Sequence, residues 1–143
     1  MIVGNPVGSD EFIRSHMSTH LTHRLDPLYH IISSITVTQA QLLLLRYSCN
    51  TNFMYWMRCV APRHTRPALE YHDAQIRGVF DRILGPATMR EMHRTQVSLS
   101  QGRGGLGLTP QVLIAPAAFL ASWCACKLRI QHSVDFKNGL KFY

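Results

Sequence analysis

Apolar residues in the first part of the chain recur with the spacing of one helix face. Four of them, at intervals of four residues, predict a helix over 9–25. They are Ile13, Met17, Leu21 and Leu25. Ser9 is a suitable N-cap for this helix, and Asp26-Pro27 is expected to end it. A short helical piece then follows, whose predicted inward positions are Leu28, Ile31, Ile32 and Ile35.

The middle of the chain contains start and stop signals for further helices. Thr38-Gln39-Ala40-Gln41 fits a capping box and precedes four leucines. The polar residues 50–52 interrupt this helix before the apolar segment FMYWMRCV (53–60), which Pro62 ends. Pro67 suits the first turn of the next helix, and Gly85-Pro86 stops it. The predicted inward stripe of that helix is Leu69, His72, Ile76, Val79, Phe80 and Ile83.

The last third combines a short alternating segment, a glycine-rich loop and a long apolar run. Residues 96–100, QVSLS, alternate well enough to predict a short extended segment. Thr109-Pro110 begins the last apolar helix, which Pro116 is expected to kink or restart, and the tail from Lys127 is polar and basic. The pattern predicts a mainly α chain: a small helical bundle with a short extended or hairpin segment near the glycines.

Charge adds a candidate partner to this helical pattern. The 143 residues make one domain with a hydrophobic fraction of 46% and a net charge of +7. Twelve of the 15 cationic residues are arginine, whose planar guanidinium pairs with phosphate in a bidentate way. The excess of arginine favours a polyanionic partner, although a basic surface that only maintains solubility would have the same composition.

Cysteines and the uncharged run bear on compartment and membrane. The four cysteines lie on apolar segments and are predicted to be reduced, buried thiols. The N-terminus lacks the pattern of a secretory signal, which favours an intracellular protein, nuclear or cytoplasmic. Residues 104–126 carry no charge, but glycines, prolines and polar residues dilute the run. A buried core helix is therefore favoured over a membrane span.

The loop SQGRGGLGLTP (100–110) contains the pattern G-x-G-x-x-G at Gly102, Gly104 and Gly107. A dinucleotide site needs this pattern between a strand and a helix, with an acidic residue about twenty positions later. Position 127 is a lysine, and the surroundings predict helices. The glycines are therefore expected to form a structural joint in which Leu106 and Leu108 enter the core.

Cationic and aromatic residues alternate in the middle of the chain. Arg46, Arg58, Arg63, His64 and Arg66 accompany Tyr47, Tyr55 and Trp56, a combination typical of nucleic-acid contacts. The alternative is that the rings belong to the core and the arginines to a solvated face. Arg103 in the glycine loop is a further candidate phosphate contact.

Other polar sets carry weaker signals. His16, His20 and His23 share one helix side and suit either a metal or, more often, a polar face beside phosphates. Asp73 and Arg77 are interpreted as an exposed i,i+4 pair. The eight acids are scattered, and no catalytic residue, metal ligand set or cofactor site is predicted.

Two motifs together suggest a family. VGNPVGSDEF (3–12) resembles the segment after the polymerase palm in reverse transcriptases of non-LTR, LINE-type retrotransposons. GGLGLTPQVLIAPAAFLASW (104–123) resembles the Gly-Gly-Leu-Gly motif and Ala-rich helix beyond their thumb. The segments between them, QLLLLRY, NFMYWMRCVAP and HDAQIRGVFDRILG, are similar to helices of the same region and occur in the same order.

The resemblance implies RNA-directed DNA synthesis by the parent enzyme, with Mg²⁺ held by palm aspartates that should lie before Met1. Asp10 and Glu11 cannot replace them because they begin a helix. This chain would then comprise a primer-grip-like strand and turn (1–8), a thumb-like bundle (9–95), the glycine joint with its apolar helix (96–126) and a basic tail (127–143). Its implied partners are a template–primer duplex of RNA and DNA and the missing palm and fingers, with no membrane. The alternative is a helical structural or interaction protein, or an inactive remnant of a retroelement.

Overall fold

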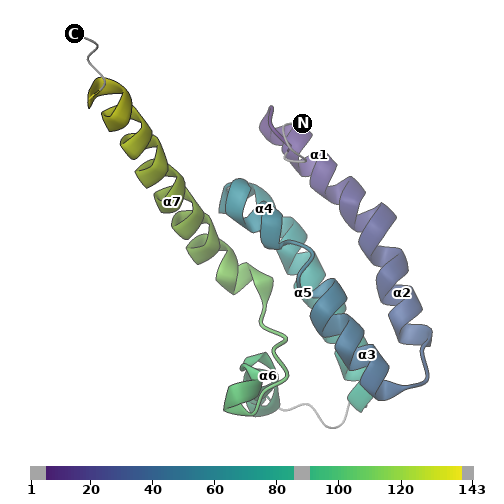
Figure 1. Cartoon of the computed structure of the whole chain (residues 1–143). Helices are drawn as coiled ribbons and strands as arrows, with labels where there is room; N and C mark the ends of the chain where they lie inside the picture. The colour runs from purple at the N-terminus through teal and green to yellow at the C-terminus, as the bar shows by residue number, and fades with distance from the viewer. Residues whose placement is uncertain (1–5, 86–90, 140–143) are drawn as a thin grey trace.

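The computed structural model describes residues 6–85 and 91–139, and every regular element in these two ranges is helical (Figure 1). The mainly α prediction is therefore confirmed. The elements are α1 (Asp10–His20), the π-helical segment η1 (Leu21–Leu25), α2 (Asp26–Ser34), α3 (Thr38–Leu44), the π-helical segment η2 (Leu45–Cys49), α4 (Met54–Cys59), α5 (Pro62–Leu84), α6 (Glu91–Ser98), the 3₁₀ turn η4 (Gln101–Arg103) and α7 (Gln111–Gly139).

The first helices, α1 and α2, form one continuous rod through η1. The Ser9 hydroxyl accepts a hydrogen bond from the Phe12 amide at 3.3 Å, as expected of an N-cap. The predicted break at Asp26-Pro27 is wrong, because the backbone stays helical through Leu25 and Asp26. The π-helical turn provides the reason: the Asp26 amide donates to the Leu21 carbonyl, and the wider turn precedes a proline that has no amide to donate.

The second rod comprises α3, η2 and α4, and the interruption predicted at residues 50–52 covers residues 50–53 in the structure. Val37, not Thr38, is the N-cap of α3, and no side chain caps this end. Gln41 has a different role from the predicted capping box. Its Nε2 donates to the Ile32 carbonyl at 3.0 Å, which ties α3 to the last turn of α2.

The central element is α5, which packs against α1, α2, α3, α4 and α7. It begins at Pro62, so Pro67 lies inside the helix and not in its first turn as predicted. It stops at Gly85, which has a φ of 83°, as the Gly-Pro signal predicted. The predicted inward stripe is correct: Leu69, His72, Ile76, Val79 and Phe80 are buried, and Ile83 packs against them.

The core between α2, α4 and α5 contains a buried polar pair. The Tyr29 hydroxyl forms a hydrogen bond with His72 Nδ1, and neither side chain is significantly exposed. Burial lowers the pKa of His72 to about 4, so the ring is neutral near pH 7. Cys49 is also buried, and its pKa is raised by burial to about 11. The prediction of four buried thiols is wrong for the other three cysteines, which are free and exposed on α4 and α7.

The predicted extended segment at residues 96–100 is wrong, because α6 runs to Ser98. A five-residue alternation is too short to separate a strand from a helix turn. Residues 99–108 then fold back over the end of α6. This glycine loop buries Leu108 as predicted, but Leu106 is exposed, so its predicted entry into the core is wrong. Of the proposed strand and turn over 1–8, residues 1–5 lie outside the described ranges, and residues 6–8 form no strand.

The last helix, α7, is attached to α5 at its first turn. Asp73 accepts hydrogen bonds from the backbone amides of Gln111 at 2.8 Å and Val112 at 3.0 Å. The Gln111 side chain donates to Asn50 Oδ1 at 3.0 Å, so the same turn is also held from the second rod. The helix starts directly after Thr109-Pro110, as predicted.

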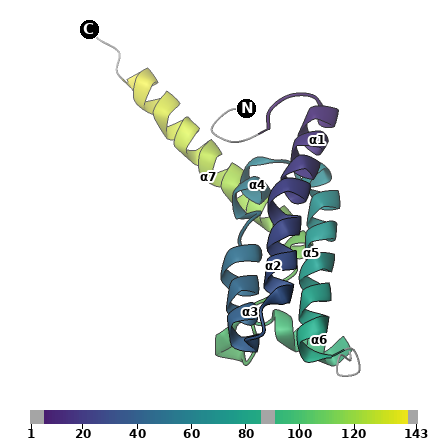
Figure 2. The same ribbon diagram turned by 90° about the vertical axis from the view of Figure 1, so that its right-hand side faces the viewer.

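Beyond this attachment α7 packs on α4 and α5 and then diverges from the bundle (Figures 1 and 2). The helix continues through Pro116 without restarting. The predicted basic tail is therefore helical as far as Gly139. The expectation that this helix is buried in the core is correct for Ala115 but wrong for Leu113, Leu120 and Trp123, which are exposed. Within the described residues, no helix combines the length and apolarity needed to cross a membrane.

We predict that Asp73→Ala lowers the free energy of unfolding by about 2–3 kcal/mol, because one buried and one partly buried backbone amide lose their acceptor. Asp73→Asn, which retains one acceptor oxygen, should lose roughly half as much. The control is Glu70→Ala on the same helix, which removes an exposed ion pair and should cost less than about 0.5 kcal/mol. Urea unfolding followed by circular dichroism measures all three; equal losses for Asp73→Ala and Glu70→Ala would contradict the attachment.

A second prediction concerns acid stability. In the unfolded chain His72 binds a proton near its usual pKa of 6.5, whereas the folded chain binds it only near pH 4. The stability contributed by the neutral ring is therefore complete above pH 6.5 and falls as the pH decreases toward 4, by about 1.4 kcal/mol per pH unit. Between pH 7 and pH 5 we expect a loss of about 2 kcal/mol from this group. His72→Gln should show a correspondingly smaller loss in urea midpoints at the two pH values, and an unchanged pH dependence would refute the assignment.

Candidate nucleic-acid interface

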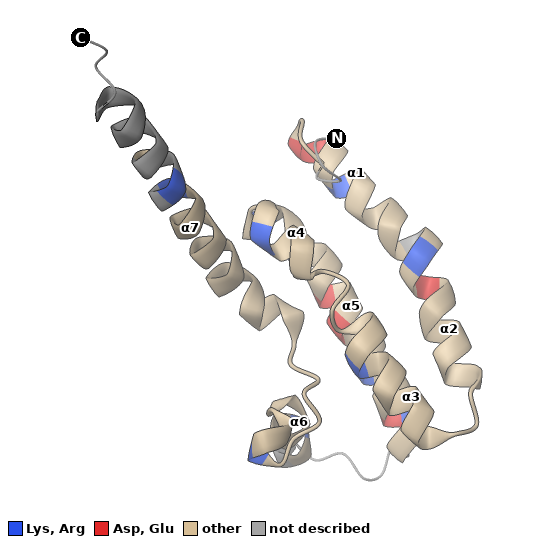
Figure 3. Ribbon diagram, viewed as in Figure 1, with Lys and Arg blue, Asp and Glu red and all other residues tan. Residues whose placement is uncertain are grey.

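Three of the predicted phosphate contacts lie where α4 ends and α5 begins. Arg58 is in the last turn of α4, Arg63 is the second residue of α5, and Arg66 follows one turn later; all three are exposed. We call this set of three the basic corner. Figure 3 shows that other basic positions are distributed over several helices, with acidic positions among them on α5. The basic corner is thus formed by chain neighbours on either side of a helix boundary.

The arginines of the basic corner differ in their local partners. Arg66 Nε donates to Glu70 Oε1 at 2.9 Å, and both side chains are exposed, so solvent screens this pair. Arg63 Nε donates to His64 Nε2 at 2.9 Å. Among the side chains that the structure describes, no carboxylate forms an ion pair with Arg58 or Arg63. These two guanidinium groups therefore keep most of their capacity to donate to an anion.

His64 lies beneath the basic corner and not on its surface. Its side chain is only 5% exposed, and Asp10 Oδ1 is 3.4 Å from its Nε2. The same Nε2 accepts the hydrogen bond from Arg63 Nε, and Nδ1 has no hydrogen-bond partner among the described residues. Burial removes His64 from direct reach of a ligand and makes it a support for the Arg63 side chain.

The structure places Arg46 and Arg103 outside the basic corner. Arg46 is half-buried on η2, with its guanidinium 4.9 Å from the centre of the Tyr47 ring and beside Gly107 of the glycine loop. Arg103 is exposed at the end of η4. That loop follows α6, at the opposite end of α5 from Arg63 and Arg66 (Figures 1 and 2). Since α5 is about 33 Å long, Arg103 is far from the basic corner. The six predicted residues therefore do not form one patch.

The predicted aromatic and histidine residues separate into surface and core. Tyr47 and Tyr55 are exposed, whereas Trp56 is buried. His16 and His20 pack on Trp56, with ring centroids 5.7 and 4.5 Å from it, and burial together with Arg24 and His16 lowers the pKa of His20. Sequence spacing could not reveal this ring contact, because Trp56 is distant in the chain. Among the described residues, no group of three or more His, Cys, Asp or Glu is arranged to hold a metal ion.

The glycine loop does not present its amides to a ligand. The backbone N–H groups of residues 103–108 all donate to carbonyls of residues 97–101, at 2.8–3.2 Å. A phosphate cradle requires such groups to point outward and unpaired. Gly105 is needed for a different reason, since a Cβ there would lie 2.1 Å from the Leu99 carbonyl oxygen. The expectation of a structural joint agrees with this geometry.

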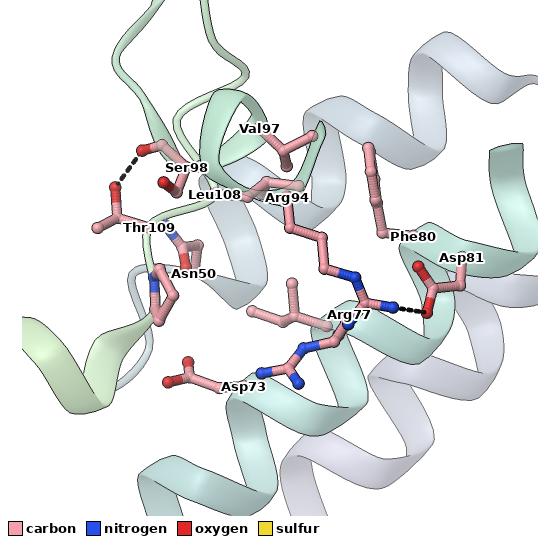
Figure 4. Close-up of a pocket in the computed structure, with 12 residues that line it drawn as sticks. Asn50, Asp73, Arg77, Phe80, Asp81, Arg94, Val97, Ser98, Leu108 and Thr109 are labelled. Atoms are coloured by element: carbon pink, nitrogen blue, oxygen red, sulfur yellow. Dashed lines mark hydrogen bonds and ion pairs between the residues drawn. The ribbon is translucent and has the colours of Figure 1, made fainter. Parts of the chain in front are cut away.

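A cavity of about 250 Å³ lies between α5, α6 and the glycine loop (Figure 4). Arg94 of α6 reaches Asp81 of α5 at 3.7 Å, and Thr109 donates to the Ser98 carbonyl at 2.8 Å. Asp73 at the same cavity is buried and bonded to α7, so its interpretation as an exposed partner of Arg77 is wrong. Burial raises the pKa of Asp73, while the two amides and the charge of Arg77 oppose the rise.

Comparison with known proteins adds no relative: no protein-family model matches the chain, and neither the curated proteins nor the solved structures contain a significant match. The placement of the arginines and the bonding of the glycine loop are therefore the structural observations that bear on function.

We predict that Gly105→Ala is strongly destabilising, by at least about 2 kcal/mol, because the added Cβ meets backbone oxygens of Leu99 and Gln96. Gly102→Ala is the matched control, since nothing lies within 4 Å of a Cβ at that position. It should change stability by no more than about 0.5 kcal/mol. Thermal and urea unfolding measure the stability of the two variants. Equal stabilities would contradict the role of Gly105 in the joint.

Proposed function

We propose that this chain is a nucleic-acid-binding fragment of a retroelement RNA-directed DNA polymerase, a thumb-like helical bundle that grips the backbone of a template–primer duplex. The observation that supports the proposal best is the basic corner, with two exposed guanidinium groups that lack a carboxylate partner within the described residues. The net charge of +7, made mostly of arginine, points to the same class of partner.

The corner would act by contacts to phosphate oxygens and not by reading bases. Guanidinium–phosphate bonds position a duplex but carry no sequence information, so binding is nonspecific. Arg58 and Arg63 make direct contacts, and Arg66 joins them by exchanging its exposed bond to Glu70 for a phosphate. His64 supports Arg63 from below, as its hydrogen bond indicates.

The remaining candidate residues have secondary places in this proposal. Arg46 lies beside the glycine loop with its guanidinium over the exposed Tyr47 ring, and Arg103 is an outlying contact for a longer duplex. Polymerisation and the Mg²⁺ that it needs belong to the palm of the parent enzyme. This chain contributes binding to the duplex backbone and no catalytic step. The proposed partners are accordingly the template–primer duplex and the palm and fingers.

The test is fluorescence anisotropy with an RNA–DNA hybrid duplex across a series of salt concentrations. Each phosphate contact contributes about −0.9 to the slope of log K against log salt, so three contacts give about −3. Reversal of the corner with Arg58→Glu, Arg63→Glu and Arg66→Glu should weaken binding at least about tenfold and make the slope shallower by about 3.

The matched control is Arg24→Glu, Arg77→Glu and Arg82→Glu, which changes net charge by the same amount on η1 and the later part of α5. It should retain most of the affinity. Equal losses in both triple variants would show that overall charge, and not the corner, determines binding. A wild-type chain that fails to bind at low salt would favour the alternative, a helical interaction protein or an inactive remnant.

A further inference from the structure

A groove of about 290 Å³ lies between the N-terminal turns of α5 and α7, directly beside the basic corner. Arg63 and Arg66 belong to both the corner and the groove, and Glu70 follows them along α5. Most of the remaining lining is apolar, from Leu69, Val112, Leu113 and Pro116. The groove therefore combines two cations, one carboxylate and apolar surface next to the residues proposed to hold phosphates.

The attachment of α7 to α5 fixes the shape of this groove. Asp73, one turn after Glu70 on α5, accepts the amide of Val112 at 3.0 Å, and Val112 lines the groove. Leu69 is fully buried, so this part of the lining is held by the core. A site that is formed before its ligand arrives loses less binding free energy to ordering.

The charged residues follow one another along the groove in a definite order. Arg63, Arg66 and Glu70 are separated by three and four residues, so they share one face of α5. The first and the last are about 10 Å apart along the helix axis. A nucleotide has the matching order, since an anionic phosphate stands at one end and a base edge with N–H donors at the other. An acidic peptide segment would instead meet Glu70 with like charge.

We propose that this groove binds one unpaired guanine nucleotide at the end of the nucleic acid that the basic corner grips. The inference rests on the proposed function, because the corner supplies the strand, and it adds a base-selective subsite to nonspecific phosphate contacts. At about 290 Å³ the groove is near the lower limit of small-ligand pockets. It therefore admits a single base and not a duplex.

Glu70 selects the base. Its Oε1 accepts a hydrogen bond from Arg66 Nε at 2.9 Å, and among the described residues no donor contacts Oε2. When Arg66 turns to a phosphate, both carboxylate oxygens become available. Guanine presents two adjacent N–H donors on its Watson–Crick edge, which a carboxylate accepts as a pair. Adenine and cytosine offer one amino group, whereas thymine and uracil have carbonyl oxygens on both sides of their single N–H, and a carboxylate repels these.

The apolar lining contacts the faces of the base. Leu113 is 73% exposed at the rim of the groove, and Pro116 is exposed one turn later. A base that lies against them removes this apolar surface from water. The planar guanidinium of Arg66 is a further group on which a base can stack.

Fluorescence anisotropy with the RNA–DNA hybrid duplex tests the subsite. The blunt duplex is compared with the same duplex extended by one unpaired guanine or one unpaired thymine. The extra nucleotide is placed at the 3′ end in one probe and at the 5′ end in a second, and the tighter of the two defines the gain over the blunt duplex. For the wild type we expect a gain of at least about fivefold with guanine and less than about twofold with thymine.

Two variants separate the groove from the corner. Leu113→Glu places a carboxylate in the groove and should abolish the guanine gain. Leu120→Glu is the matched control, because it makes the same change at another exposed leucine of α7 that does not line the groove, and it should keep the gain. Glu70→Gln should give equal gains with guanine and thymine. Each gain is a ratio within one protein, so a general change in duplex affinity cancels.

The outcomes distinguish this inference from the proposed function. A wild type that binds no duplex at low salt would overturn both. Blunt-duplex binding with the expected salt dependence but no gain from an unpaired guanine would overturn the subsite alone. Equal gains with guanine and thymine in the wild type, a guanine preference that survives Glu70→Gln, or equal losses in Leu113→Glu and Leu120→Glu would each refute it as well.

Discussion

The carboxylate of Asp73 is the interaction on which the position of the last third of the chain depends. It accepts hydrogen bonds from two backbone amides in the first turn of α7. The N–H groups of a helix's first turn have no carbonyl partner within the helix itself. A negative charge is also favoured there by the helix dipole. Because α5 is the central helix of the bundle, this one side chain fixes the position of α7, and of the glycine loop before it, relative to the bundle. The hydrogen bond from the Gln111 side chain to Asn50 connects the same turn of α7 to the second rod.

Repeating patterns within a helix were predictable from the sequence, and contacts between distant segments were not. The stripe from Leu69 to Phe80 and the stop at Gly85 depend on local spacing and on one glycine, and both were correct. The predicted helix end at Asp26-Pro27 is wrong because a π-helical turn before the proline satisfies the backbone in a way that residue order alone does not reveal. The prediction of buried thiols is wrong for Cys124 and Cys126 because α7 turns only part of its circumference toward the bundle, so an apolar segment there is not the same as a buried one.

The candidate site shows the same division. Arg58, Arg63 and Arg66 fall on either side of a helix boundary that prolines mark in the sequence, so their proximity could be predicted. His64 could not be separated from them, because only the packing of α1 against α5 buries it. Asp73 resembled an exposed ion-pair partner because its i+4 neighbour is an arginine. The amides that bind it lie 38 and 39 positions away, beyond the range of any local pattern.

The bonding of the glycine loop limits how this fold can hold a phosphate. With the amides of residues 103–108 committed to carbonyls of residues 97–101, recognition of a polyanion falls to side chains. Side-chain guanidinium groups on separate helices suit a long, repeating backbone better than a single bound nucleotide, since each makes its own contact.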